Sequence, residues 1–223
     1  MSIEYDVVSI GALSRNRLWN ETQPRRAAHA TTTLIRDGRT TILVDPGLPA
    51  EALTQRLDER TGLRPEQIEA VFLTNFRPAH RRALERYASA SWLMHEAEIA
   101  AVRAHLDEME LRPDVEDDVR RLIGQERALL SRIRPAPEKL TPGVHLFPTA
   151  GVTPGAAGLL LALPARTVVI AGDAVISRAY YEAGRLFEQA ACVEEAREAF
   201  VELTEIADEI VPGHDNAFRV FGR

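Results

Sequence analysis

The stretch VFLTNFRPAH, residues 71–80, runs from an apolar segment through a proline turn to a single histidine. Its first residues are aromatic, branched and apolar, and such residues pack well on the pleated surface of a strand. Pro78 marks a turn, and the basic residues that follow it favour a helix. We therefore expect a buried strand, a turn and a basic helix, with His80 where the strand gives way to the helix.

Segments of the same form occur elsewhere in the chain, where an apolar run ends in a turn that carries polar residues. Loops at strand ends are the places where a rigid scaffold presents functional groups. We expect the site among these loops, which read ILVDPG at 42–47, FPTAGVTPG at 147–155, VIAGDA at 169–174 and EIVPGHD at 209–215.

The strand runs form pairs, and helical patterns lie between them. Residues 31–45 predict a hairpin that turns at Asp37-Gly38, a pair that suits positive φ angles. Residues 159–163 and 167–171 predict a second, buried pair. Apolar residues at helical spacing mark helices before Gly62, within 95–134 and around 196–207. The two helices within 95–134 form an insertion that could be a lid, a homodimer face or plain packing.

Composition limits the classes of protein that this chain can belong to. The 223 residues suit one domain over residues 1–223, and a hydrophobic content of 45% is ordinary for a globular protein. The net charge is -6 with both signs interspersed, which argues against a nucleic-acid groove or a basic membrane-binding face. We expect a small-molecule ligand or substrate as the partner, with no nucleic acid and no membrane.

The single cysteine, Cys192, excludes an internal disulfide and a thiolate zinc cluster. Any metal must then be held by His, Asp or Glu. The N-terminal residues predict a strand rather than a signal peptide, and no apolar window approaches the roughly 20 residues that span a bilayer. We expect a cytoplasmic protein.

The strand-end loops, in this order over nearly the whole chain, resemble those of the metallo-β-lactamase superfamily. In that family the segment equivalent to residues 75–80 usually reads H-x-H-x-D-H, and the segment equivalent to 149–155 usually reads T-P-G-H-T-P-G. The resemblance implies an α+β fold, the four-layered αββα sandwich with two mixed sheets, carrying the helical insertion at about residues 95–134.

This chain departs from the family pattern at four of seven metal positions. His80, Asp173 and His214 stand at positions that the family uses as ligands, whereas other residues replace the remaining ligands: Asn75, Arg77, Ala79 and Val152. The resemblance implies that Asn75, Arg77 and Val152 occupy one zinc site, which has lost all its histidines. The second site has lost only its aspartate, at Ala79, and Asp173 bridges both.

The resemblance therefore implies a divergent metallo-hydrolase with at most one metal, held by His80, Asp173 and His214, with Asp173 and His80 in the catalytic role. Zinc fits this donor set first, and manganese or iron are alternatives. Such an enzyme would hydrolyse an ester, lactone, thioester or amide. The alternative is a metal-free pseudo-enzyme that binds a ligand or another protein, in which Arg77 pairs with Asp173 and replaces the lost cation.

Several further residues are candidates for the pocket beside Asn75, Arg77 and Val152. Asp45 and Asp215 are polar groups at strand ends, and Tyr181 stands where the family's substrate side often lies. The polar loop at 15–26 carries Trp19 and four arginines. It could recognise an anion, although a solvated loop is the interpretation that we favour from sequence.

Overall fold

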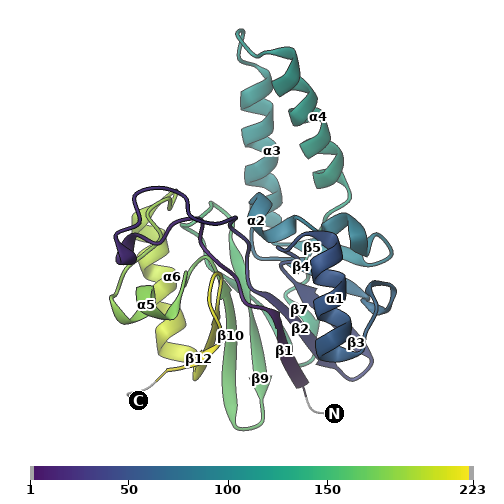
Figure 1. Cartoon of the computed structure of the whole chain (residues 1–223), viewed down its shortest axis with the longest axis vertical. Coiled ribbons are helices and arrows are strands. Elements are labelled where there is room, and N and C mark those ends of the chain that lie inside the picture. Colours follow the sequence, from purple (N-terminus) through teal and green to yellow (C-terminus); the bar gives the residue numbers. More distant parts are fainter. Residues whose placement is uncertain (1–2, 221–223) are drawn as a thin grey trace.

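In the computed structural model, which describes residues 3–220, two six-stranded sheets lie between helices (Figure 1). The strand order is β1-β2-β3-β4-β5-β6 in one sheet and β12-β11-β10-β9-β8-β7 in the other. Each sheet contains parallel and antiparallel pairs, so both are mixed. The first sheet comes from residues 3–135 and the second from residues 139–219.

The first sheet begins with the predicted hairpin. Its strands are β1 (Ile3–Ser9), β2 (Thr32–Asp37), β3 (Thr40–Val44), β4 (Ala70–Leu73), β5 (Ser91–Met94) and β6 (Arg134–Pro135). The hairpin turn lies one residue later than the sequence predicted, because Asp37 pairs with Thr40 and leaves Gly38-Arg39 as the loop. Gly38 alone takes a positive φ, of 65°.

The second sheet contains the other predicted pair of strands. Its strands are β7 (Lys139–Thr141), β8 (Val144–Pro148), β9 (Ala157–Leu163), β10 (Arg166–Gly172), β11 (Glu209–Pro212) and β12 (Phe218–Arg219). β9 and β10 pair in antiparallel register from Leu163 opposite Arg166. β11 runs parallel to β10, so the loops that follow these two strands emerge at the same edge of the sheet.

Alternation along the strands explains the layers. On β10, Val168 and Ile170 point into the core between the sheets, whereas Val169 points to the outer face that packs under Leu203. On β3, Ile42 and Val44 likewise face the second sheet while Leu43 faces the helical side. Since successive side chains on a strand point to opposite faces, each sheet buries both faces. The four-layered αββα sandwich is confirmed.

Helices cover the outer faces of both sheets. α1 (Ala50–Thr61) lies on the first sheet and ends at Gly62, which adopts a φ of 69°. α6 (Val193–Ile206) lies on the second sheet. Shorter helical turns occupy the connections: η1 (Arg17–Trp19), η2 (Pro65–Gln67), α2 (Pro78–Arg81), η3 (Leu84–Tyr87) and α5 (Arg178–Glu182).

The predicted insertion is a helical hairpin that projects from the sandwich. α3 (Glu96–Glu110) and α4 (Asp117–Ser131) pack against each other and extend away from the sheets (Figure 1). Their buried contacts include Ile99 and Leu106 on α3 and Ile123 on α4.

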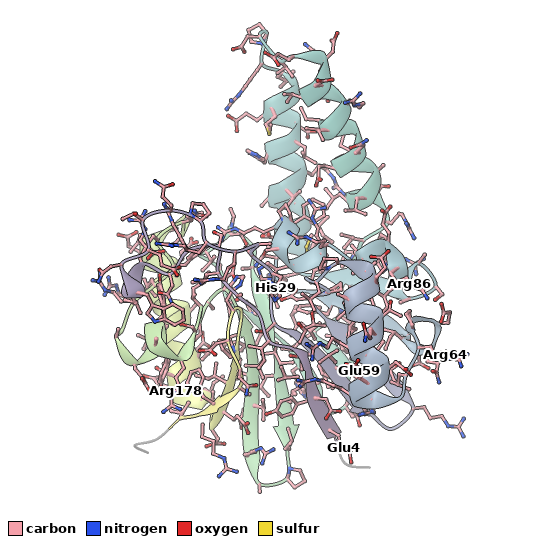
Figure 2. All side chains as sticks on the ribbon, viewed as in Figure 1. Glu4, His29, Glu59, Arg64, Arg86 and Arg178 are labelled. Atoms are coloured by element: carbon pink, nitrogen blue, oxygen red, sulfur yellow. The ribbon has the colours of Figure 1, made fainter. Side chains whose placement is uncertain are left out.

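Many charged side chains lie on the outside of the sandwich. Glu4, Glu59, Arg64, Arg86 and Arg178 are all exposed at its periphery (Figure 2). Among the described residues, none of the helices has the length and apolar character needed to cross a bilayer.

Candidate metal site

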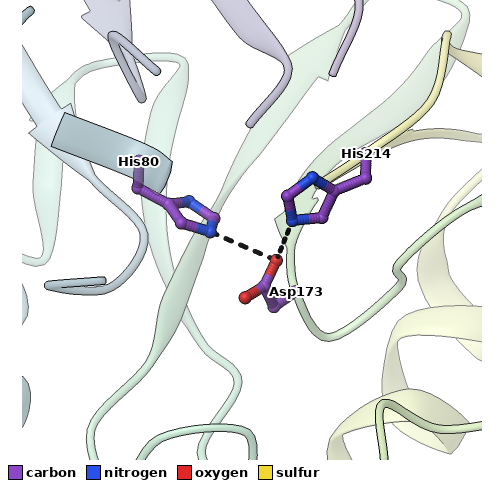
Figure 3. Close-up of side chains that lie close together, drawn as sticks. All are labelled: His80, Asp173 and His214. Atoms are coloured by element: carbon purple, nitrogen blue, oxygen red, sulfur yellow. Dashed lines mark ion pairs between the residues drawn. The ribbon is translucent and has the colours of Figure 1, made fainter. Parts of the chain in front are cut away.

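Three of the strand-end loops bring His80, Asp173 and His214 together at one edge of the sandwich (Figure 3). His80 comes from α2 after β4, Asp173 follows β10, and His214 follows β11. One oxygen of Asp173, Oδ1, lies 3.2 Å from His80 Nε2 and 3.1 Å from His214 Nε2. All three residues are buried. Residues that are 134 positions apart in sequence therefore form one cluster, as we expected for the three ligand positions.

His80 is held from behind by Asp45. Its Nδ1 lies 2.9 Å from Asp45 Oδ2. Because a buried carboxylate can only accept, Nδ1 carries the proton and Nε2 faces Asp173. Thr74 in turn donates its hydroxyl to Asp45 Oδ2 at 2.6 Å and its backbone N-H to Asp45 Oδ1 at 2.9 Å. A carboxylate behind a histidine in this way orients the ring and raises its basicity as a metal ligand.

The backbone of Asp45 adopts a φ of 50°, which is rare for a residue other than glycine. The side chain is only 2% exposed, and its carboxylate meets both Thr74 and His80. Such strain persists where surrounding contacts impose it, and it clusters at functional sites. The sequence alone had suggested that Asp45 lines the pocket. In the structure it instead lies beneath the cluster and supports His80.

His214 is oriented by a backbone carbonyl. Its Nδ1 donates to the carbonyl oxygen of His29 at 2.9 Å, which leaves Nε2 facing Asp173. The side chain of His29 instead contacts the backbone oxygens of Ala27 and Ile10, so only its carbonyl supports the site.

The donor set fits one divalent ion. Asp173 Oδ1 is buried, and although the two imidazole nitrogens are within ion-pair distance, neither contact has the geometry of a hydrogen bond. Ligand atoms around a tetrahedral zinc with bonds of about 2.0–2.1 Å stand about 3.3 Å apart, close to both observed separations. Two neutral imidazole nitrogens and one carboxylate oxygen also match the ligand types of mononuclear zinc sites.

Arg77 occupies the region where the resemblance implies the other zinc site. Its Nη1 donates to Asp173 Oδ2 at 3.2 Å, and its Nη2 donates to the carbonyl oxygens of Val152 and Gln189 at 3.1 and 3.0 Å. The guanidinium also lies over the ring of Phe187, 5.0 Å from its centroid. The pairing of Arg77 with Asp173, which the sequence offered as part of the metal-free alternative, is present. It places a permanent positive charge beside the second oxygen of Asp173.

The two other replaced positions of this half carry no metal-binding side chain. Asn75 uses its Oδ1 to accept from the backbone N-H of Arg77, and its Nδ2 lies 3.3 Å from His80 Nε2. Val152 is 2% exposed and offers only its carbonyl, which Arg77 already uses. Both residues serve to fix Arg77, and neither is among the residues that line the cavity above His80, Asp173 and His214.

The protonation of the cluster follows from its charges. Burial alone would lower the pKa of His80, but the carboxylates of Asp173 and Asp45 outweigh burial and raise this pKa. Burial alone would raise the pKa of Asp173, but the imidazoles of His80 and His214 hold it well below its ordinary value. A proton on His80 Nε2 and a metal ion would compete for the same lone pair.

Two residues predicted for the pocket, Tyr181 and Asp215, do not line the cavity above the cluster, so both predictions are wrong. Tyr181 packs on the outer face of the second sheet, where its ring centroid lies 5.1 Å from that of Phe218 and 5.7 Å from that of Phe200. Asp215 turns back to the chain, where its carboxylate accepts from the backbone N-H groups of Arg178 and Asn216. Each side chain is held by neighbouring groups away from the cavity, and a polar residue near a strand end gives no sign of such contacts in the sequence.

A cavity of about 160 Å³ opens above His80, Asp173 and His214. Ala79 lies on its wall, where the family's aspartate would stand. Arg77 also lines the cavity, and the remaining wall comes from two further segments. These are the N-terminal loop, with Leu13, Ser14, Arg15, Arg17 and Ala28, and the residues after α5, with Phe187, Glu188 and Gln189. The predominance of arginine in the N-terminal loop was the only sequence signal for this wall.

Glu98 supports the site from the helical hairpin. It is 1% exposed, and its carboxylate accepts from the backbone N-H of Phe76 and from that of Gly155, both at 3.1 Å. A Cβ on Gly155 would approach the backbone of Glu98 to 2.0 Å, so only glycine allows this close contact. The first turn of α3 thus ties together the loops that carry Arg77 and Val152.

Comparison with known proteins agrees with this architecture. A family model described as the metallo-beta-lactamase superfamily matches residues 25–214. No curated protein matches the sequence.

Three solved structures illustrate the likeness. A metallo-β-lactamase-like protein of Thermotoga maritima shares 16% identity with a TM-score of 0.72, over 99% of this chain and 100% of that one. The hydrolase AbOPH shares 14% with a TM-score of 0.66, over 100% and 88%. The dizinc quorum-quenching lactonase AidC shares 14% with a TM-score of 0.64, over 92% and 80%. At these identities the structures establish the fold, and the family model establishes the family: this chain belongs to the metallo-β-lactamase superfamily.

Proposed function

We propose that this chain is a hydrolase-like protein that binds at most one divalent metal through His80, Asp173 and His214. Zinc is the first candidate, since it is typical of the superfamily, and manganese and iron are alternatives. The substrate class is an ester, lactone, thioester or amide of a small molecule. AidC, a lactonase whose structure contains the product N-hexanoyl-L-homoserine, has the same fold.

The observation that carries this proposal is the state of Asp173 Oδ1. This oxygen is buried, makes no hydrogen bond with any described residue, and faces two imidazole nitrogens at 3.1 and 3.2 Å. A buried carboxylate oxygen without a hydrogen bond is costly, and a cation is the partner that satisfies it. Both imidazoles are already oriented by their Nδ1 contacts, so little rearrangement is needed for binding.

The chain's own groups define the reduced chemistry of the site. When bound, a divalent ion supplies Lewis-acid polarisation of the substrate carbonyl. Asp45 holds the tautomer of His80, and Arg77 holds the orientation of Asp173. Ala79 offers no proton acceptor where the family has its aspartate, so proton transfer falls to solvent. Because a positioned acid or base contributes typically 10² to 10⁴ in rate, we expect slow turnover.

A second candidate is a metal-free pseudo-enzyme that binds a ligand or another protein through the same pocket. The contact of Arg77 with Asp173 favours it, because the guanidinium supplies a fixed positive charge beside the carboxylate without any ion. A protonated His80 between Asp45 and Asp173 would neutralise the remaining negative charge of these two carboxylates.

The metal content of the protein, purified without added metal or chelator, separates the two candidates. We expect about one equivalent of one metal in the wild type, and its loss in His214→Ala, which removes one donor. His105→Ala is the matched control, because this histidine is exposed on α3 and should leave the metal content unchanged. Wild-type protein without metal, even after incubation with zinc, would overturn the first candidate in favour of the second.

A further inference from the structure

The cavity above the metal site has a wall of arginines whose charges are not all used within the protein. The N-terminal loop, dark purple in Figure 1, leaves β1 and passes over the strand ends toward the side of α5 and α6. It contributes Arg15 and Arg17 to the wall, and Arg77 lies on the same wall. We propose that this pocket recognises a small ligand through an anionic group, a carboxylate or a phosphate, which binds Arg15 and Arg17. The inference deepens the proposed function and rests on this pocket being its site.

The loop is folded around its own acid, and the guanidinium groups of Arg15 and Arg17 have no acidic partner among the described residues. Glu21 accepts from the backbone N-H of Asn16 at 2.6 Å and pairs with the guanidinium of Arg26. Arg26 also lies over the ring of Trp19, 5.8 Å from the centroid. Among residues 3–220, no carboxylate lies within ion-pair distance of Arg15 or Arg17. Glu21, the one acid between residues 10 and 30, is therefore already used.

Arg15 is half-buried, which distinguishes it from a solvated surface arginine. A guanidinium loses hydration when it is partly buried, and it recovers that energy through charge-assisted hydrogen bonds with an anion. Its planar donor fork matches the oxygens of carboxylates and phosphates. For Arg15 the proposal therefore replaces the solvated-loop interpretation with a role in ligand binding.

The acids on the cavity wall are engaged elsewhere. Glu188 accepts from the hydroxyl of Tyr180 at 2.8 Å, and Asp173 is surrounded by Arg77, His80 and His214. The guanidinium of Arg77 already donates to Asp173 and to two backbone carbonyls. It therefore adds positive electrostatic potential to the cavity but offers no free pair of donors to a ligand. Arg15 and Arg17 are the charged groups on this wall whose guanidinium groups pair with no acid of the protein.

The size of the cavity limits the ligand. About 160 Å³ is many times the roughly 10–15 Å³ that a single water needs on the same measure. This space holds a carboxylate or phosphate together with a short substituent, and a longer ligand would extend out of the mouth.

Binding of two simple probes to protein stripped of metal tests the inference. Inorganic phosphate and propionate are titrated separately by calorimetry at constant ionic strength, with Arg15→Gln beside wild type. Arg25→Gln is the matched control, because Arg25 is exposed on the same loop and does not line the cavity. Melting curves confirm that both variants are folded.

We expect wild type and Arg25→Gln to bind at least one probe with the same affinity, and Arg15→Gln to bind it about tenfold or more weakly, because a charge-assisted bond is lost. Which probe binds tells a phosphate-bearing from a carboxylate-bearing ligand. Failure of both probes to bind wild type, or equal binding by both variants, overturns the inference. Anion binding that survives in a protein unable to bind zinc would contradict only the proposed hydrolase.

Discussion

The guanidinium of Arg77 lies 3.2 Å from the carboxylate oxygen Oδ2 of Asp173, while the other oxygen, Oδ1, faces two histidines. The carboxylate of Asp173 therefore contacts a guanidinium through one oxygen and two imidazole nitrogens, which can bind a metal, through the other. In the family this aspartate bridges two ions. Here Oδ2 pairs with Arg77, and Oδ1 is the oxygen that makes no hydrogen bond with a described residue.

Removal of the Arg77 side chain should destabilise the protein. Arg77→Ala leaves Asp173 Oδ2 and the carbonyl oxygens of Val152 and Gln189 without this donor. Breaking a buried pair costs about 3–5 kcal/mol, and because the Arg77 side chain is 27% exposed we expect a smaller loss, about 2 kcal/mol. Urea unfolding measures it. Arg77→Lys keeps the positive charge but loses the paired donors of the guanidinium, so its stability should lie between those of wild type and Arg77→Ala. Equal unfolding midpoints for Arg77→Ala and wild type would show that this contact does not stabilise the site.

Asp45→Asn should weaken metal binding while the fold persists. Asparagine tolerates the positive φ of residue 45 better than most residues, so backbone strain is little changed. The neutral amide cannot raise the basicity of His80 as the carboxylate does, and outer contacts of this kind are worth about 10–100-fold in affinity. Competition with a chelating indicator measures the zinc affinity. An unchanged affinity would mean that Asp45 only shapes the backbone.

Glu98→Ala should loosen the two loops that carry Arg77 and Val152. It leaves the buried N-H groups of Phe76 and Gly155 without an acceptor, and each such group costs about 1–3 kcal/mol. Glu98→Gln retains an acceptor oxygen and should lose less. Glu108→Ala, exposed on the same helix, should change the free energy of unfolding by no more than about 0.5 kcal/mol. Similar losses for Glu98→Ala and Glu108→Ala would contradict this supporting role.

The helical hairpin carries an apolar groove, and we predict that a second copy of the chain binds there. A cavity of about 610 Å³ between α3, α4 and the Arg77 loop is lined by Val102, Met109 and Leu122 among others, and Leu122 is 55% exposed. We predict a homodimer at micromolar concentration that Leu122→Glu converts to monomer, as seen by light scattering. Val201→Glu on α6 is the control, because Val201 is similarly exposed at 48% and lies on another face. A monomeric wild type would remove this prediction.

Local patterns predicted the elements that carry the site. Apolar runs and turns placed β4, β10 and β11, and helical spacing placed α3 and α4, because these signals arise from neighbours in sequence. The cluster of His80, Asp173 and His214 required the family register, since no local rule brings residues so far apart into contact. The resemblance also gave Arg77 its place beside Asp173.

The remaining features depend on tertiary contacts that leave no local signal. Nothing in LVDPG shows that Asp45 takes a positive φ under His80, and nothing in HEAEIA shows that Glu98 is buried between two loops. Tyr181 was assigned to the pocket by its position in the family, but its ring finds an aromatic partner on the outer face of the sheet instead. The position of Arg15 on the cavity wall depends on its loop folding over the strand ends, which the sequence does not show.

The central claim is that one half of the ancestral metal site is occupied by Arg77 and the other half can hold a single ion. Anomalous diffraction from crystals grown with excess zinc tests it most directly. We predict one zinc peak, bounded by His80, Asp173 and His214, with the guanidinium of Arg77 still on Asp173. Two peaks around Asp173, or one peak on the side of Asn75 and Val152 with Arg77 displaced, would contradict the account.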